Sequence, residues 1–223
     1  SGPQSVKFYN VPKVTNITRT VETSWPTLTS FTIGSNWSPG FYIVASRNAS
    51  GAIENFAPLI IRGHVGTSKL LLIHSTMTWQ TYNRFGGRSA YYGPLDPKRE
   101  RSRVVSFDRP MTGSGINHVD RDGIALVQWL EEEGISFDQI SDTDINRWPS
   151  LIKNYNGIIL SGHPEYMTNR EFKSIIAARN MGINLAIFGA NSAYWQVRTE
   201  ASAFGADRKV VDRKSTRLNS SHV

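Results

Sequence analysis

The hydrophobic residues of the first 66 positions fall in short runs separated by glycine, proline and asparagine. The runs at residues 27–33, 41–45 and 57–61 are rich in β-branched and aromatic side chains, a composition typical of strands. A Ser-Pro-Gly turn at residues 38–40 favours a hairpin-like connection. The pattern predicts that residues 1–66 form a β-rich segment with sandwich-like packing, which we interpret as the end of an upstream β domain.

From residue 67 onward, short apolar runs alternate with stretches of helical periodicity. The first such stretch, residues 121–133, follows Asp120 as its expected N-cap and precedes Gly134, which is expected to end the helix. One face of this helix would be apolar, formed by Ile124, Val127 and Leu130. The runs themselves are typical of buried strands and lie at residues 70–73, 104–107, 137–140, 158–160 and 185–188.

A second helix is predicted from a capping box in which Thr168 is followed three residues later by Glu171. It would end at Gly182 and would bury three apolar side chains, Phe172, Ile175 and Ile176. Strands alternating with helices predict an α/β fold for residues 67–211, with a parallel sheet and helices on both of its faces.

The end of the chain differs from the rest. Residues 212–223 have neither helical nor strand periodicity, and we predict a foreign or disordered tail there. Because the chain starts with Ser1 rather than methionine, we expect it to be a piece of a longer protein. We also expect a truncation near Val211, which would leave the fragment inactive. The compartment stays open between the bacterial cytoplasm and secretion.

The net charge of +7 does not indicate a nucleic-acid partner, because of where the charge lies. Five Lys or Arg and two Asp fall in residues 207–223, so that segment alone carries +3. A basic cluster at residues 98–103 has no aromatic residues interleaved with it, unlike a single-strand binder. No apolar run is long enough to span a membrane. The absence of cysteine excludes disulfides and thiolate nucleophiles.

Polar residues follow three of the predicted parallel strands, at residues 75–89, 162–166 and 189–195. The carboxyl ends of parallel strands meet at one edge of a sheet, where ligands bind, so we expect Tyr82, His163 and Glu165 to share one pocket. Glu165 is a candidate metal ligand or general base, the alternative being an acid that favours a helix N-terminus. His163 is a candidate ligand or base, or is bonded to nearby backbone. Tyr82 is a site residue or an aromatic lid.

The segment at residues 189–192 occupies the place of a nucleophile elbow but offers no nucleophile with a histidine partner. A Ser-His-Asp triad is therefore disfavoured. Asn191 and Ser192 are typical helix caps, so we expect a helix to start there, with free backbone N–H groups facing the same cleft as Glu165 and binding an oxyanion. Asn83, next to Tyr82, is a third candidate for contact with substrate.

Four motifs together resemble the large (beta) subunit of N,N-dimethylformamidase and its relatives, over residues 38–211. They are TWQTYNRFGG at residues 78–87, SFDRP at 106–110, GHPEY at 162–166 and GANSAYW at 189–195. The resemblance implies a carboxy-terminal domain similar to the class I glutamine amidotransferase fold. That fold places a cysteine at the elbow, and this chain has none, so glutamine hydrolysis is disfavoured.

The resemblance also implies a mononuclear iron held by two tyrosines and one glutamate. Tyr82 matches the first tyrosine and Glu165 the glutamate, whereas the second tyrosine falls at Phe107, whose side chain cannot ligate. We therefore expect Phe107 to lie beside Tyr82 and Glu165, in the place of the missing tyrosine ligand. This departure from the family's pattern puts iron binding in doubt. The candidates for a replacement ligand are Tyr91, Tyr92, Asp108, His163 and Tyr166.

Two functions follow as hypotheses. The first is a metal-dependent hydrolase of non-peptide amide C–N bonds, with Glu165 and His163 as catalytic residues and a small-molecule amide as substrate. The alternative is a non-catalytic, amidotransferase-like module that binds a ligand at the same edge. The expected protein partners are a second copy of the chain or a small accessory subunit, with neither nucleic acid nor membrane.

Overall fold

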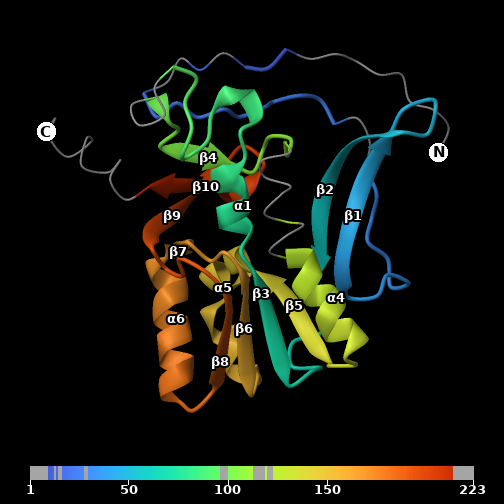
Figure 1. Ribbon diagram of the computed structural model, residues 1–223, viewed down its shortest axis with the longest axis vertical. Coiled ribbons are helices and arrows are strands. Elements are labelled where there is room, and N and C mark those ends of the chain that lie inside the picture. The colour runs from blue at the N-terminus through green and yellow to red at the C-terminus, as the bar shows by residue number, and fades with distance from the viewer. Residues whose placement is uncertain are drawn as a thin grey trace, which may run out of the picture.

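The computed structural model describes residues 10–212, apart from residues 13, 15–16, 28–29, 96–99, 113–118 and 120–122. Three sheets make up the fold (Figure 1). A parallel sheet forms one layer, a second four-stranded sheet lies beyond its carboxyl edge, and a two-stranded hairpin lies beside the parallel sheet. Within the described residues, no helix combines the length and apolarity needed to cross a membrane.

The hairpin consists of β1 (Gly40–Arg47) and β2 (Ile53–Ile61), which pair antiparallel. The strands predicted at residues 41–45 and 57–61 are therefore confirmed. Their turn lies at residues 48–52, where the Asn48 side chain accepts the backbone N–H groups of Ser50 and Ala52. The turn expected at residues 38–40 leads into β1 and joins no hairpin in the described residues. The prediction of a strand at residues 27–33 is wrong, because the described residues of this run lie outside every sheet. Strand propensity alone is not sufficient without a partner edge, and two strands do not make a sandwich.

The parallel sheet has the strand order β5-β3-β6-β8. Its strands are β3 (Leu70–His74), β5 (Phe137–Ser141), β6 (Gly157–Gly162) and β8 (Asn184–Gly189). Every neighbouring pair in this sheet is parallel and starts at the same level. The prediction of a parallel sheet is confirmed, and its carboxyl ends form one edge.

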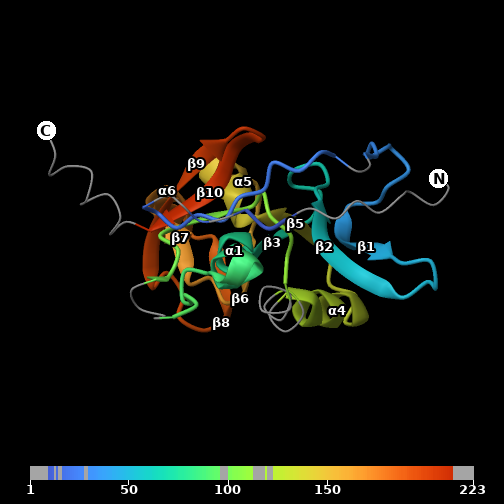
Figure 2. The ribbon, with the colours of Figure 1, turned by 90° about the horizontal axis from the view of Figure 1, so that it is seen from above.

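Helices cover both faces of this sheet (Figure 2). On one face, α4 (Ala125–Glu132) packs Val127 and Leu130 against Leu72 and Ile159. On the other face, the alternate residues of the same strands pack against the following elements, α5 (Asp142–Arg147), the 3-10 helix η3 (Pro149–Asn154) and α6 (Asn169–Asn180). In β3 and β6 both faces are buried, as the continuous apolar runs predicted, whereas β8 at the edge has no buried residue.

Several details of the helices differ from prediction. Thr168 caps α6 by accepting the backbone N–H of Glu171, as expected, and the predicted cap Asp120 lies outside the described residues. Phe172 is 45% exposed rather than buried, because α6 turns Glu171, Ile175 and Ala178 toward the sheet. A complete capping box begins α5, where Ser141 and Asp144 bond reciprocally.

Of the second four-stranded sheet, the sequence predicted only the first strand, at residues 104–107. Its order is β4-β10-β9-β7, with the strands β4 (Val104–Ser106), β7 (Tyr166–Thr168), β9 (Trp195–Ser202) and β10 (Gly205–Asp212). Asp212, expected to start the tail, ends β10 and pairs with Arg101 at 3.3 Å. The rest of the predicted tail lies outside the described residues, and the amidotransferase-like topology stays a prediction.

The helix α1 (Thr76–Tyr82) connects the two sheets (Figure 1). It follows β3 directly, and its Met77 packs in the core of the second sheet with Val105, Val197 and Val210. A short 3-10 helix, η1 (Phe85–Gly87), comes next. The helix therefore carries Tyr82 from the carboxyl edge of the parallel sheet into the space beneath the second sheet.

Candidate functional site

The side chain of Glu165 is the centre of a buried polar cluster at the carboxyl edge of the parallel sheet. Glu165 is 1% exposed. Its Oε2 accepts a hydrogen bond from the Tyr82 hydroxyl at 2.7 Å and lies 2.8 Å from His163 Nε2. Its Oε1 accepts a short hydrogen bond from the Tyr91 hydroxyl. We define the Glu165 cluster as Tyr82, Tyr91, His163 and Glu165.

The rings of the cluster pack against one another. Tyr82 stacks on Tyr91 with 4.6 Å between centroids, and His163 meets Tyr82 edge-on at 5.8 Å. A third tyrosine, Tyr166, meets Tyr91 edge-on at 6.1 Å. Such contacts restrict ring rotation, so the hydroxyl and imidazole groups are held in fixed directions toward Glu165.

The backbone around Glu165 is fixed by a sharp turn after β6. Gly162 has a φ of 75°, a left-handed conformation that glycine adopts without strain. The next parallel strand approaches it so closely that a Cβ added to Gly189 would lie 1.5 Å from the Gly162 carbonyl oxygen. The N–H groups of Ala193 and Trp195 donate to the carbonyl oxygens of Pro164 and Glu165. These bonds hold the carboxylate under the second sheet.

Tyr91 reaches the cluster from the loop after α1. The Ser89 hydroxyl oxygen accepts the backbone N–H groups of Tyr91 and Tyr92, and the N–H of Ala90 donates to the Thr81 carbonyl oxygen. The loop is thus attached to the same helix that carries Tyr82. As a result, the two tyrosines arrive side by side.

The electrostatics of the cluster favour protonated phenols. Burial, reinforced by hydrogen bonds to Tyr91 and Glu165, raises the pKa of Tyr82 far above its ordinary value. Burial and the bond to Glu165 likewise raise the pKa of Tyr91. Burial and the bond to Tyr91 raise the pKa of Tyr166. At neutral pH the phenols therefore keep their protons, Tyr82 and Tyr91 donate hydrogen bonds to Glu165, and a bound cation would favour the phenolate forms.

His163 is the member of the cluster that reaches an open hollow. Its side chain is 15% exposed and lines a depression of about 720 Å³ between α4 and the end of β8. The other walls are mainly apolar, formed by Ala125, Leu126, Trp129, Phe188, Ala190 and two glycines. A small molecule in this hollow would meet the imidazole before any other polar group of the cluster.

A family model for the C-terminal part of N,N-dimethylformamidase beta subunit-like proteins matches residues 1–222. The chain belongs to this family. Two relatives, the N,N-dimethylformamidase beta subunits of Paracoccus aminophilus and of an Alcaligenes species, are each 28% identical over 123 residues. Those residues are 50% of this chain but 16% of each relative, so the chain spans a small part of the relatives' length.

The structure of this dimethylformamidase-family chain brings Tyr82, His163 and Glu165 together, as the sequence predicted. The Phe107 side chain packs against the same apolar cluster as Tyr82, which includes Met77, Val105 and Tyr166, and its expected place beside Glu165 stays a prediction. The Phe107 ring lies under the Arg208 guanidinium at 5.8 Å, and it lines a cavity with Thr143 and Asp144. Phe107 follows β4, whose pairing with β10 turns it toward this other cavity.

The predicted oxyanion residues differ from expectation in two ways. Asn191 and Ser192 begin no helix; they lie in a turn with a positive φ at Asn191 that leads into β9. Asn and Ser favour turns as strongly as helix caps. Asn83 is fully buried, and its amide donates to the Gln80 and Pro110 oxygens while its oxygen accepts from Phe85 and Thr112. It has no polar atom left for a substrate.

Tyr91 is the residue that sequence reasoning placed least well. It is one of five candidates for a replacement ligand, and in the structure Tyr91 and His163 are the two of these that contact the Glu165 carboxylate. The signal in the sequence is the pair Tyr91-Tyr92 in a loop rich in glycine and tyrosine. That composition marks a functional loop without indicating which hydroxyl points inward.

Proposed function

We propose that this chain carries the metal-binding and proton-transfer side of an amide-bond hydrolase. The observation that supports it is the convergence of two phenols and an imidazole on the buried carboxylate of Glu165. Among the described residues, no group of three or more His, Cys, Asp or Glu side chains could hold a metal. A metal at this edge therefore needs the tyrosine oxygens.

The donor set fits iron. Phenolate and carboxylate oxygens are hard ligands that suit a ferric ion, and Tyr82, Tyr91 and Glu165 would hold it, with His163 close by. When bound, the ion would supply Lewis acidity to an amide carbonyl. This assignment takes its second tyrosine from Tyr91, so the phenylalanine at position 107 no longer argues against a metal.

The chain's own residues supply the remaining parts of the reaction. The apolar walls of the hollow beside His163 suit the alkyl groups of a small N-substituted amide and exclude water from them. With its Nε2–H donated to Glu165, His163 would take a proton from the attacking water on its other ring nitrogen, Nδ1, and deliver it to the leaving nitrogen. The carbonyl carbon gains the hydroxyl of water, the C–N bond breaks, and a carboxylic acid and an amine result.

One observation favours the alternative, a non-catalytic module. The Glu165 carboxylate already accepts hydrogen bonds from both tyrosines, which raised pKa values keep protonated. The cluster is therefore internally satisfied without a metal. In that reading it is a structural centre, and the hollow beside His163 is the ligand site.

Ferric iron is expected to bind the purified chain with a visible phenolate-to-iron charge-transfer band. Because both phenols must lose their protons, the apparent affinity should rise steeply with pH. Tyr91→Phe and Glu165→Gln should each weaken binding by about 10-fold or more. Titration at several pH values, read by visible absorbance, measures this, and amine release from N,N-dimethylformamide measures hydrolysis.

Two variants serve as controls. Tyr42→Phe removes a phenol whose hydroxyl bonds the Ser38 carbonyl oxygen far from the cluster, and it should leave the band unchanged. Phe107→Tyr adds a phenol at the position that the resemblance matched to the second tyrosine, and it should also change nothing. A stronger band in Phe107→Tyr would sink the assignment of Tyr91. No band in any protein would favour the non-catalytic module.

A further inference from the structure

A second cavity, distinct from the hollow beside His163, lies where the hairpin, α1, α5 and β10 meet. Its volume is about 430 Å³, within the range of small-molecule sites. Much of its wall is apolar, formed by Leu59, Ile60, Trp79, Phe107, Pro110 and Met111. We name it the hairpin cavity.

The helix α1 separates the hairpin cavity from the Glu165 cluster. Thr76, Trp79 and Gln80 line the cavity. Thr78, by contrast, accepts the backbone N–H of Tyr166, and Tyr82 donates to Glu165. The two sites therefore use different faces of one short helix, and a ligand in the hairpin cavity would not compete with one at Glu165.

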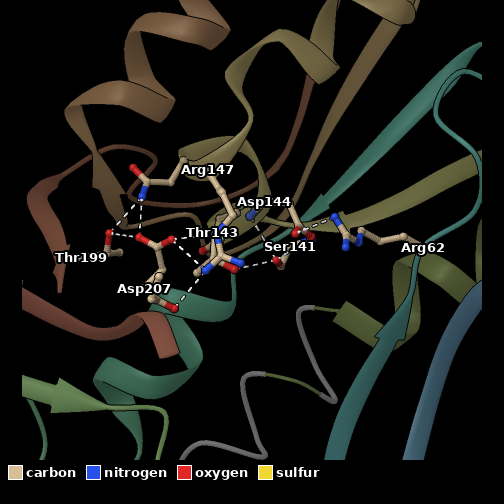
Figure 3. Close-up of polar contacts among 10 residues, drawn as sticks. Arg62, Ser141, Thr143, Asp144, Arg147, Thr199 and Asp207 are labelled. Carbon is tan, nitrogen blue, oxygen red and sulfur yellow. Dashed lines mark hydrogen bonds and ion pairs between the residues drawn. The ribbon is translucent and has the colours of Figure 1, made fainter. Parts of the chain in front are cut away.

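The polar wall of the hairpin cavity is an ordered network (Figure 3). Arg62 pairs with Asp144 at 3.2 Å, and Asp144 is fixed in the capping box with Ser141. The wall continues into a smaller space of about 290 Å³, which Arg147 and Asp207 line and where they pair at 3.0 Å. These bonds fix the arginines in place before any ligand arrives.

The charge of the hairpin cavity is unbalanced toward cations. Its lining contains Arg62, Arg109 and Arg208 but only one carboxylate, Asp144. Arg208 also pairs outside the lining, with Asp108 at 2.5 Å. Arg62 and Arg208 are 45% and 40% exposed in their side chains and are each ion-paired, which leaves Arg109 as the arginine of the lining without an ion pair among the described residues.

Arg109 is the most informative of the three. It is 5% exposed, and its terminal nitrogens donate to four carbonyl oxygens, those of Gln80, Asn83, Phe85 and Arg88. None of the ion pairs among the described residues includes it, and its Nε is buried without a hydrogen-bond partner. Burial lowers the pKa of Arg109 to about 10, so the group is still a cation at neutral pH. A buried cation without a carboxylate favours a nearby anion.

We propose that the hairpin cavity binds a small organic monocarboxylate with an apolar or aromatic body. The carboxylate would lie against the arginines of the wall, since guanidinium groups bind carboxylates through paired N–H donors. The body would lie among Trp79, Phe107 and Met111. A multiply charged anion such as a phosphate ester fits less well, because Asp144 lies in the same wall and the remainder is apolar.

Benzoate is the probe that tests this site, by isothermal titration calorimetry on the full chain. We expect one molecule per chain and an affinity at least about 10-fold higher than that of benzyl alcohol or benzylammonium, which lack the anion. Arg62→Gln should weaken benzoate binding by about 10-fold. Ala57→Trp, which places a large ring in the wall, should abolish it. Iron binding should be unaffected by either change.

Arg198→Gln is the matched control, because Arg198 is similarly exposed and ion-paired, at 2.6 Å with Glu200, but does not line the cavity. It should leave the benzoate affinity unchanged. Circular dichroism separates misfolding of Ala57→Trp from blocked binding, and Arg62→Gln keeps the test independent of that variant. No heat of benzoate binding up to about 10 mM, or equal affinity for benzyl alcohol, overturns the proposal. An unchanged affinity in Arg62→Gln does so too.

Discussion

Lowering the pH from 7 to 4 is expected to cost the chain about 3 kcal/mol of unfolding free energy through His74 alone. His74 ends β3 and is fully buried, with Nε2 bonded to Gln139 at 2.9 Å and Nδ1 without a partner. Burial lowers its pKa from 6.5 to about 4, partly offset by the bond to Gln139. Its ring packs between Phe41 and Trp79.

The direction follows from proton binding. Between pH 6.5 and about 4 the unfolded chain protonates this histidine and the folded chain does not. Its contribution is therefore fully present above pH 6.5 and is lost as the pH falls toward 4, at about 1.36 kcal/mol for each pH unit.

Urea unfolding of His74→Gln at pH 7 and pH 4 measures this contribution. The variant should lose about 3 kcal/mol less than the unmutated chain between the two values. His64→Gln, which replaces an exposed histidine, is the control and should lose as much as the unmutated chain. An equal loss in all three proteins would show that His74 is not the group that titrates.

The parallel sheet was predictable because its signal is local. Each strand is a short apolar run, and the carboxyl-edge rule then placed Tyr82, His163 and Glu165 together without knowledge of any contact. That β8 lies at the edge of the sheet could not be predicted from its own residues. Ile187 and Phe188 are each 48% exposed, although their run is as apolar as that of β6. Burial depends on which strand becomes the edge, and strand order is a tertiary property.

The second sheet escaped prediction for a related reason. Its first strand, β4, pairs with β10, about a hundred residues later in the chain. The residues of β9 are mostly polar, and only Val197 among them is buried. The placement of Phe107 and Tyr91 depends on this pairing and on the loop bonds around Ser89. Comparing motifs alone therefore did not place Tyr91 beside Tyr82.

The sequence also contains a local signal for the start of α5. The Ser141-to-Asp144 spacing is a capping motif, as informative as the one at Thr168, and it begins α5. That helix builds the polar wall of the hairpin cavity. It also supplies Asp142, which accepts hydrogen bonds at the start of α1, the helix that carries Tyr82.

Asp142 and Glu171 form a buried acidic pair that holds the start of α1. Asp142 accepts the Thr76 hydroxyl at 2.5 Å and the Met77 backbone N–H at 2.9 Å. Glu171 is 2% exposed, and its Oε2 has no hydrogen-bond partner. Burial, with a smaller effect of Asp144, raises the pKa of Asp142 to about 7. Burial and the charge of Asp142 raise the pKa of Glu171 well above its ordinary value.

The effect of these two acids on stability changes with pH in the opposite direction to that of His74. The folded chain holds protons on these acids at pH values where the unfolded chain has released them. The stability they contribute is therefore present below the unfolded values of 3.8 and 4.5 and is lost as the pH rises through the folded ones. In the unmutated chain this loss partly cancels the gain from His74, so only variants separate the two.

Glu171→Gln is expected to stabilise the chain at pH 8 by about 2 kcal/mol, because it removes one of two adjacent buried charges. At pH 5 the two proteins should be nearly equal, since the acid is then already protonated. Urea unfolding at both values measures the difference. Glu132→Gln, an exposed position on α4, should be neutral at both. A Glu171→Gln protein that is equally destabilised at pH 5 and pH 8 would show that the pair carries no charge repulsion. If the pair acts as described, the protection factor of the Met77 amide should fall between pH 5 and pH 8 in the unmutated chain but not in Glu171→Gln, because Asp142 holds the start of the helix that ends at Tyr82.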